Sequence, residues 1–218
     1  MSTLTANPPL NDPRLIDTDL PATPLHLSDS AQDLLFRDAA TANSFADTPV
    51  SDAQMRAVFD LVKWAPTAMN SQPLRVVLVR TPEARADLLE MMAEGNRAKT
   101  EAAPLVAILA ADHDFHDELP RVFPVFPRAR EAFSNDDQRA QSAGFNAALQ
   151  AGYFLVGIRA AGLAAGPMGG FDADAISNRF FPDGRHQAML VVNIGRPTDA
   201  SYRPRLPRLD YDEVVTAA

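Results

Sequence analysis

A turn bounded by two prolines, set between a helix pattern and a strand pattern, constrains this chain more than any other feature. The segment 64–73 reads WAPTAMNSQP and leads directly into the strand-like run 75–79. Pro66 ends the preceding helix because proline has no backbone N–H group to donate. The hydroxyl and amide side chains that follow can hydrogen-bond a planar ligand. We therefore expect this segment, called the proline turn below, to form a rigid polar turn at a binding site.

The composition indicates one large globular domain. The 218 residues are 46% hydrophobic and 22% charged, and cysteine is absent, which excludes disulfides, thiolate nucleophiles and cysteine-bound metals. The formal charge of −8 argues against nucleic-acid binding, which needs a clustered basic face. Because the chain has no long apolar run and no basic stretch followed by an apolar one at its start, we expect a cytoplasmic protein without a membrane span or secretory signal.

The chain divides into an N-terminal arm and one domain. Residues 1–27 carry five prolines and little periodicity, which predicts an extended arm, and residues 28–218 form the domain. Periodicity and capping residues predict helices at 28–42, 51–65, 82–95, 96–103, 138–161 and 172–180, and strands at 75–79, 105–111, 163–165 and 188–195. We expect residues 112–137 to form a mobile excursion over a site, and residues 166–171 to form a loop. The irregular alternation favours an α+β fold, with a central sheet of about four strands wrapped by helices.

Three polar clusters each permit a functional and a structural interpretation. The paired glycines of 166–170 can bring backbone N–H groups close to a ligand or form a plain tight turn. The segment 112–118, with two histidines among carboxylates, can bind a metal or form a solvated loop. The arginines at 196, 203, 205 and 208 can bind phosphate or carboxylate, or form surface ion pairs. Dinucleotide-binding, P-loop and nucleophile-elbow patterns are absent from the sequence.

Several separated segments match one known pattern in the expected order. They are 36–45, 66–73, 96–99, 166–172, 193–197 and 203–207. Together they resemble the FMN-dependent nitroreductase family, whose signature turn reads Pro-Ser-x-x-Asn-Ser-Gln-Pro. Within that family the resemblance is closest to the malonic semialdehyde reductase (3-hydroxypropionate dehydrogenase) branch of pyrimidine degradation. The features shared with that branch include Lys63-Trp64, Gly95-Asn96, Gly166-Pro167-Met168 and the run 205–209.

The resemblance implies a nitroreductase-like fold, with a central mixed sheet wrapped by helices in an intertwined homodimer. It also implies FMN at the dimer interface and NAD(P)H as co-substrate. Hydride would pass through the flavin N5 in a ping-pong cycle, so that no protein side chain acts as a nucleophile. Arg97 or Lys99 could favour the anionic reduced ring. The implied cofactor-binding residues are Thr41, Asn43, Pro66, Thr67, Ala68, Asn70, Asn96, Lys99, Gly169, Gly170, Arg203 and Arg205.

One segment departs from the family pattern. Where the family carries Arg-x-Ser-x-Arg or Lys, residues 39–43 read AATAN and contain no cation. The phosphate would then depend on Arg203 and Arg205. We expect an FMN-dependent NAD(P)H oxidoreductase that reduces a small-molecule acceptor, with malonic semialdehyde giving 3-hydroxypropionate. The alternatives are a broad nitroaromatic or quinone reductase, and a non-catalytic family member with weak FMN binding.

Overall fold

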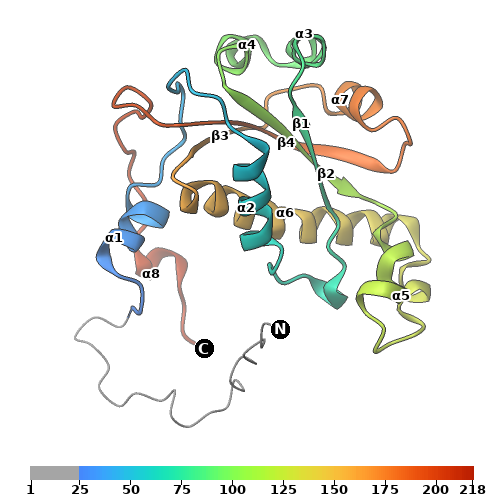
Figure 1. Cartoon of the computed structure of the whole chain (residues 1–218). Coiled ribbons are helices and arrows are strands. Elements are labelled where there is room, and N and C mark those ends of the chain that lie inside the picture. Colours follow the sequence, from blue (N-terminus) through green and yellow to red (C-terminus); the bar gives the residue numbers. More distant parts are fainter. Residues whose placement is uncertain (1–24) are drawn as a thin grey trace, which may run out of the picture.

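The computed structural model describes residues 25–218. Of the predicted arm, residues 1–24 lie outside the described residues. Helices and strands follow one another along the chain without a repeated unit (Figure 1). The helical elements are α1 (Asp29–Gln32), η2 (Asp33–Arg37), α2 (Asp52–Val62), η3 (Ala68–Asn70), α3 (Pro82–Met91), α4 (Glu94–Glu101), η4 (Phe115–Glu118), α5 (Leu119–Val122), η5 (Ala129–Phe133), α6 (Asp136–Ala160), α7 (Ala173–Phe180) and α8 (Tyr211–Val214). The strands are β1 (Leu74–Val79), β2 (Leu105–Asp112), β3 (Ala164–Met168) and β4 (His186–Gly195).

The four strands form one sheet in the order β1-β2-β4-β3. Each neighbouring pair is antiparallel, so the prediction of a mixed sheet is wrong for the described residues. All residues of β2 are buried, as its unbroken apolar run predicts for a central strand. β1 and β3 are therefore the two edges of the sheet.

Helices cover both faces of the sheet, which confirms the predicted α+β class (Figure 1). One core joins α2 and α6 to the sheet through Val58, Phe154 and Ile158. A second core joins α3 and α7 to the opposite face through Leu88 and Ile176. The strand side chains that alternate between these cores give the sheet two buried faces.

Helix α6 is the longest element of the described chain, and its buried stripe is rich in small residues. The stripe includes Gly157, where an added Cβ would collide with the side chain of Val62 on α2. Small residues therefore let α2 and α6 pack closely.

The structure corrects several predicted boundaries. The first helix stops at Arg37 rather than near 42, because the N–H of Ala42 donates to the carbonyl of Ala165 on β3. The third helix stops at Met91, since Met92 is extended and bridges to Phe171. Residues 166–168, predicted as part of a loop, are the end of β3.

The segment 112–137 also differs from the predicted irregular excursion. It contains three short helical elements, η4, α5 and η5, and its Phe115 and Leu119 side chains are fully buried. These side chains pack in a third cluster with Ala143 and Ala147 of α6. The segment therefore belongs to the packed domain, although its helices are too short to show a period in the sequence.

Candidate functional site

The proline turn has a strained backbone. Met69, Asn70 and Gln72 have φ angles of 51°, 50° and 45°, in the left-handed region that residues other than glycine rarely adopt. Conformations of this kind persist only where the surroundings hold them, and they concentrate at functional sites. Thr67 contributes by accepting the Gln72 N–H at 3.2 Å through its hydroxyl oxygen.

Two amide side chains of α6 accept hydrogen bonds from the backbone of the proline turn and of the strand residue that follows it. The Oδ1 of Asn146 accepts the Ala68 N–H at 2.8 Å, and the Oε1 of Gln150 accepts the Leu74 N–H at 2.9 Å. Asn146 is buried and also donates to the Ser142 carbonyl at 2.9 Å. Sequence reasoning missed both amides. The sequence signal that could have found them is their spacing: residues 146 and 150 are four apart, and residues four apart on a helix share one face.

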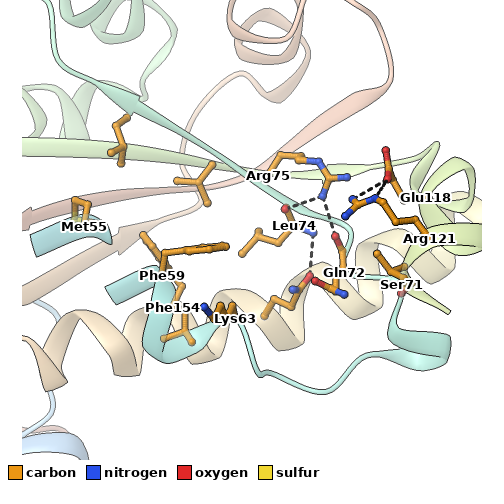
Figure 2. A pocket seen from close by; sticks show the side chains of 15 residues that line it. Met55, Phe59, Lys63, Ser71, Gln72, Leu74, Arg75, Glu118, Arg121 and Phe154 are labelled. Atoms are coloured by element: carbon orange, nitrogen blue, oxygen red, sulfur yellow. Dashed lines mark hydrogen bonds and ion pairs between the residues drawn. The ribbon is translucent and has the colours of Figure 1, made fainter. Parts of the chain in front are cut away.

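A cavity of about 570 Å³ lies next to the turn, between α2, β1 and α6 (Figure 2). One end is apolar and aromatic, with Met55, Phe59 and Phe154. The opposite end is polar and holds Arg75 and Ser71. Ser71 is buried, and its hydroxyl has no hydrogen-bond partner among the described residues. The volume is in the usual range for small-molecule sites.

A buried carboxylate lies beyond the polar end of this cavity. Asp112 is bound by Arg75 at 2.7 Å and by Arg185 at 2.9 Å, and the contact with Asp112 raises the pKa of the Arg185 guanidinium. The Asp112 carboxylate thus serves an ion-pair network. Across residues 25–218, no group of three or more histidine, aspartate or glutamate side chains is arranged to hold a metal ion.

A second group of predicted residues gathers along β3. We call it the glycine edge, and it comprises Thr41, Asn43, Asn96, Lys99, Gly169 and Gly170. The Asn96 Nδ2 donates to the Gly170 carbonyl at 2.9 Å, which attaches α4 to the end of β3. The Lys99 carbonyl accepts from Asn193 of β4 at 3.1 Å. The Asn43 N–H donates to the Ser201 carbonyl, so the C-terminal tail lies here as well.

The two glycines of this edge differ in their surroundings. A Cβ on Gly170 would meet the Asn96 Nδ2 at 2.7 Å, whereas a Cβ on Gly169 would meet nothing within 4 Å. Neither glycine N–H donates to a backbone carbonyl in the described part of the chain. Two N–H groups without a carbonyl partner, one of them on a glycine with open space beside its Cα, fit the edge of a planar group that carries hydrogen-bond acceptors, such as a flavin ring.

Two arginines converge on the segment that lacks the family's cations. Arg205 donates through Nη2 to the carbonyls of Arg37 and, at 3.0 Å, Ala39, while Arg159 of α6 donates to the Ala40 carbonyl at 2.8 Å. Arg203 is exposed and has no hydrogen bond or ion pair within residues 25–218. Burial lowers the pKa of the Arg159 guanidinium; Tyr202 raises this pKa and Arg205 lowers it.

Within one chain the predicted site is split. Pro66, Thr67, Ala68 and Asn70 lie in the proline turn, which leads into β1, whereas the glycine edge lies along β3. These are opposite edges of the sheet, separated by three inter-strand spacings, or roughly 14 Å. A single copy therefore does not bring the two groups together.

The sequence model of the Nitroreductase family matches residues 40–196. Among curated proteins, one from Streptomyces coelicolor, provisionally named NADH dehydrogenase/NAD(P)H nitroreductase, is 59% identical over 193 residues, which are 88% of this chain and 98% of that protein. A Streptomyces griseus protein with the same provisional name is 58% identical over 193 residues, with the same coverage of both chains.

The fold has solved counterparts. A structure from Exiguobacterium sibiricum, described as a provisional nitroreductase in complex with FMN, aligns with a TM-score of 0.75 and 18% identity. The alignment covers 88% of this chain and 98% of the other. At this identity the likeness shows a shared fold.

Proposed function

This chain belongs to the nitroreductase family, and we propose that it acts as an FMN-dependent NAD(P)H oxidoreductase. The observation that carries the proposal is the glycine edge, where two backbone N–H groups have no carbonyl partner, Gly169 has open space beside it and arginines lie nearby. The provisional NAD(P)H nitroreductase names of the relatives support the electron donor. The FMN complex of a protein with the same fold supports the cofactor.

The residues of the chain bind and orient the cofactor. Gly169 and Gly170 offer N–H donors to the ring, Thr41 and Asn43 offer polar groups along the chain of the cofactor, and Lys99 adds a cation on the same side. Pro66, Thr67, Ala68 and Asn70 cover the ring from a second copy. When bound, FMN supplies the hydride transfer between NAD(P)H and the acceptor.

The split of the site supports a homodimer. The exposed side chains of Phe145, Leu149 and Tyr153 form an apolar stripe on α6, each four residues from the next. Two of these residues directly precede the amides that hold the proline turn. Burying the stripe against a second copy brings a turn of one chain towards the glycine edge of the other. The exposed apolar side chains of the tail, Leu206, Leu209, Tyr211, Val214 and Val215, suit the same partner.

We take malonic semialdehyde as the first acceptor to test, giving 3-hydroxypropionate. The polar end of the cavity holds Arg75, which is paired with Asp112, and Arg121, which is paired with Glu118. The carboxylate of this acceptor would share the remaining N–H donors of these two guanidinium groups. The aromatic end, with Phe59 and Phe154, favours a second class of acceptor, the nitroaromatics and quinones. Both classes are small molecules that fit a cavity of this size.

Purification tests the cofactor directly. We expect a yellow protein with flavin absorbance bands, and FMN released by denaturation in a ratio near one per chain. A protein that is colourless and does not take up added FMN would contradict the proposed function.

Steady-state assays test the acceptor. NAD(P)H oxidation is followed with malonic semialdehyde, a nitroaromatic and a quinone at matched concentrations. The malonic semialdehyde assignment requires the highest kcat/KM for that substrate. A preference for either aromatic acceptor would transfer the assignment to the second class.

A further inference from the structure

The segment 37–40 draws two guanidinium groups to one place. The carbonyls of Arg37 and Ala39 accept from Arg205, and the carbonyl of Ala40 accepts from Arg159. Arg205 comes from the tail and Arg159 from the last turn of α6, so the two charges reach the segment from elements far apart in the sequence. The charge of Arg205 also disfavours the charged form of Arg159, which indicates that the two groups are close.

These two charges are not neutralised by the part of the chain that the structure describes. Neither Arg159 nor Arg205 has a carboxylate within 4.0 Å among residues 25–218, where their hydrogen-bond acceptors are neutral carbonyls. Arg37, on the same segment, is paired with Asp33 at 3.0 Å and with Asp29 at 3.4 Å. The unneutralised positive charge near this segment is therefore that of Arg159 and Arg205.

Two guanidinium groups held together without a counter-ion attract an anion. Each guanidinium has five N–H donors, and the carbonyl bonds leave most of them free. Phosphate suits such a pair because its oxygens accept several charge-assisted hydrogen bonds at once. The half-buried position of Arg159 strengthens the interaction, since its surroundings screen charge less than bulk water does.

We propose that Arg159 and Arg205 together form the phosphate-binding site for the flavin mononucleotide, with Arg159 supplying the cation that residues 39–43 lack. The inference rests on the proposed function, because it takes FMN as the ligand. Arg159 is half-buried and fixed at the end of α6, whereas Arg205 and Arg203 lie on the exposed tail. Arg159 is thus the fixed member of the pair, and it was not among the residues predicted from sequence.

The test compares FMN with riboflavin, which has the same ring and ribityl chain but no phosphate. Dissociation constants are measured by quenching of flavin fluorescence on the full-length apoprotein. We expect Arg159→Gln to weaken FMN binding by about tenfold or more, and to leave riboflavin binding within about twofold. Arg205→Gln is expected to act in the same direction. Inorganic phosphate is expected to compete with FMN but not with riboflavin.

A matched control comes from the same segment. Arg37→Gln removes a charge that is already paired, so the ratio of FMN to riboflavin affinity is expected to stay within about twofold of the wild type. If Arg159→Gln does not fold, Arg159→Met and Arg159→Lys make the same comparison, because both keep the aliphatic stem and only lysine keeps the charge. Lysine is then expected to retain more of the FMN preference than methionine does.

The flavin affinities and the KM values distinguish the ways in which the proposal can fail. An equal loss of FMN and riboflavin binding in Arg159→Gln would show that Arg159 only positions Ala40. Unchanged binding of both flavins would also overturn the proposal. A change in the KM ratio of NADPH to NADH, with an unchanged FMN to riboflavin ratio, would assign the cation to the nucleotide phosphate instead. Wild-type protein that binds neither flavin would refute the proposed function itself.

Discussion

Asn146 is the single side chain on which the shape of the proline turn most depends. Its amide lies in the buried face of α6, where it accepts from the turn and donates to its own helix. The turn it holds includes two consecutive residues with left-handed φ angles, Met69 and Asn70. A buried hydrogen bond that stabilises a strained segment contributes to both stability and geometry.

Replacing this amide is expected to destabilise the protein. Asn146→Leu keeps the branching of the side chain at Cγ but leaves the Ala68 N–H without an acceptor, and the expected loss is about 1–3 kcal/mol in the free energy of unfolding. Urea denaturation measures it. Gln141→Leu, at an exposed position of the same helix, serves as control and should change the free energy by less than about 0.5 kcal/mol. Equal effects of the two substitutions would contradict the role given to Asn146.

Single residues show where sequence reasoning succeeds and where it fails at a site. The turn and the paired glycines were visible because proline and glycine restrict or free the backbone in ways that depend on local sequence. Asn146 and Arg159 were not visible, because each acts through a contact with a residue far away in the chain. Their importance depends on tertiary structure, which local patterns do not contain.

At the scale of elements, β2 and the start of α2 follow from the sequence almost residue by residue, whereas α2 ends at Val62, before the predicted residue 65. Ser51 and Gln54 form a capping box at the start of α2, and the buried apolar run forms β2. The end of β3 was missed because Gly166 and Pro167 disfavour strand by propensity. The structure explains the glycine, since a Cβ there would approach the Ala42 carbonyl oxygen to 2.5 Å. Close packing of an edge strand against a loop thus overrides local propensity.

The contact between α2 and α6 gives a matched pair of substitutions. Gly157→Ala places a methyl group against Val62, a β-branched side chain with few alternative rotamers, and is expected to cost about 1–3 kcal/mol. Gly144→Ala meets nothing within 4 Å and is expected to stabilise the helix by about 0.5–1 kcal/mol. Thermal unfolding of both variants checks the pair. Stabilisation by Gly157→Ala would show that the two helices are not closely packed.

At the scale of the whole molecule, the arrangement of the sheet decides how the site is completed. The order β1-β2-β4-β3 puts the proline turn and the glycine edge at opposite edges. Sequence motifs identified both groups but gave no information about their separation, because strand order depends on long-range pairing. Within the described residues, no helix is long and apolar enough to cross a membrane.

The apolar stripe on α6 gives a prediction about assembly. Wild-type protein is expected to have twice the chain mass in light scattering, while Leu149→Glu is expected to dissociate, because a charge would be buried without a partner. FMN binding should weaken in parallel. Asn178→Glu, on the exposed face of α7, is the control and should remain dimeric. Wild-type protein with the mass of one chain would contradict the proposed dimer.

The opposite placement of the two groups has a genetic consequence. Consider two variant chains that can form the proposed dimer: one lacks Arg159 and Arg205, and the other has a disrupted proline turn. A mixed dimer of these two chains keeps one intact site, because one site combines the two sound halves. A dimer of a wild-type chain with a chain that carries both defects keeps none, since each site then receives one damaged half. Two lesions on separate copies of the gene would therefore complement, with every intact site in a mixed dimer. When both lesions share one copy, every intact site would instead lie in a dimer of two wild-type chains.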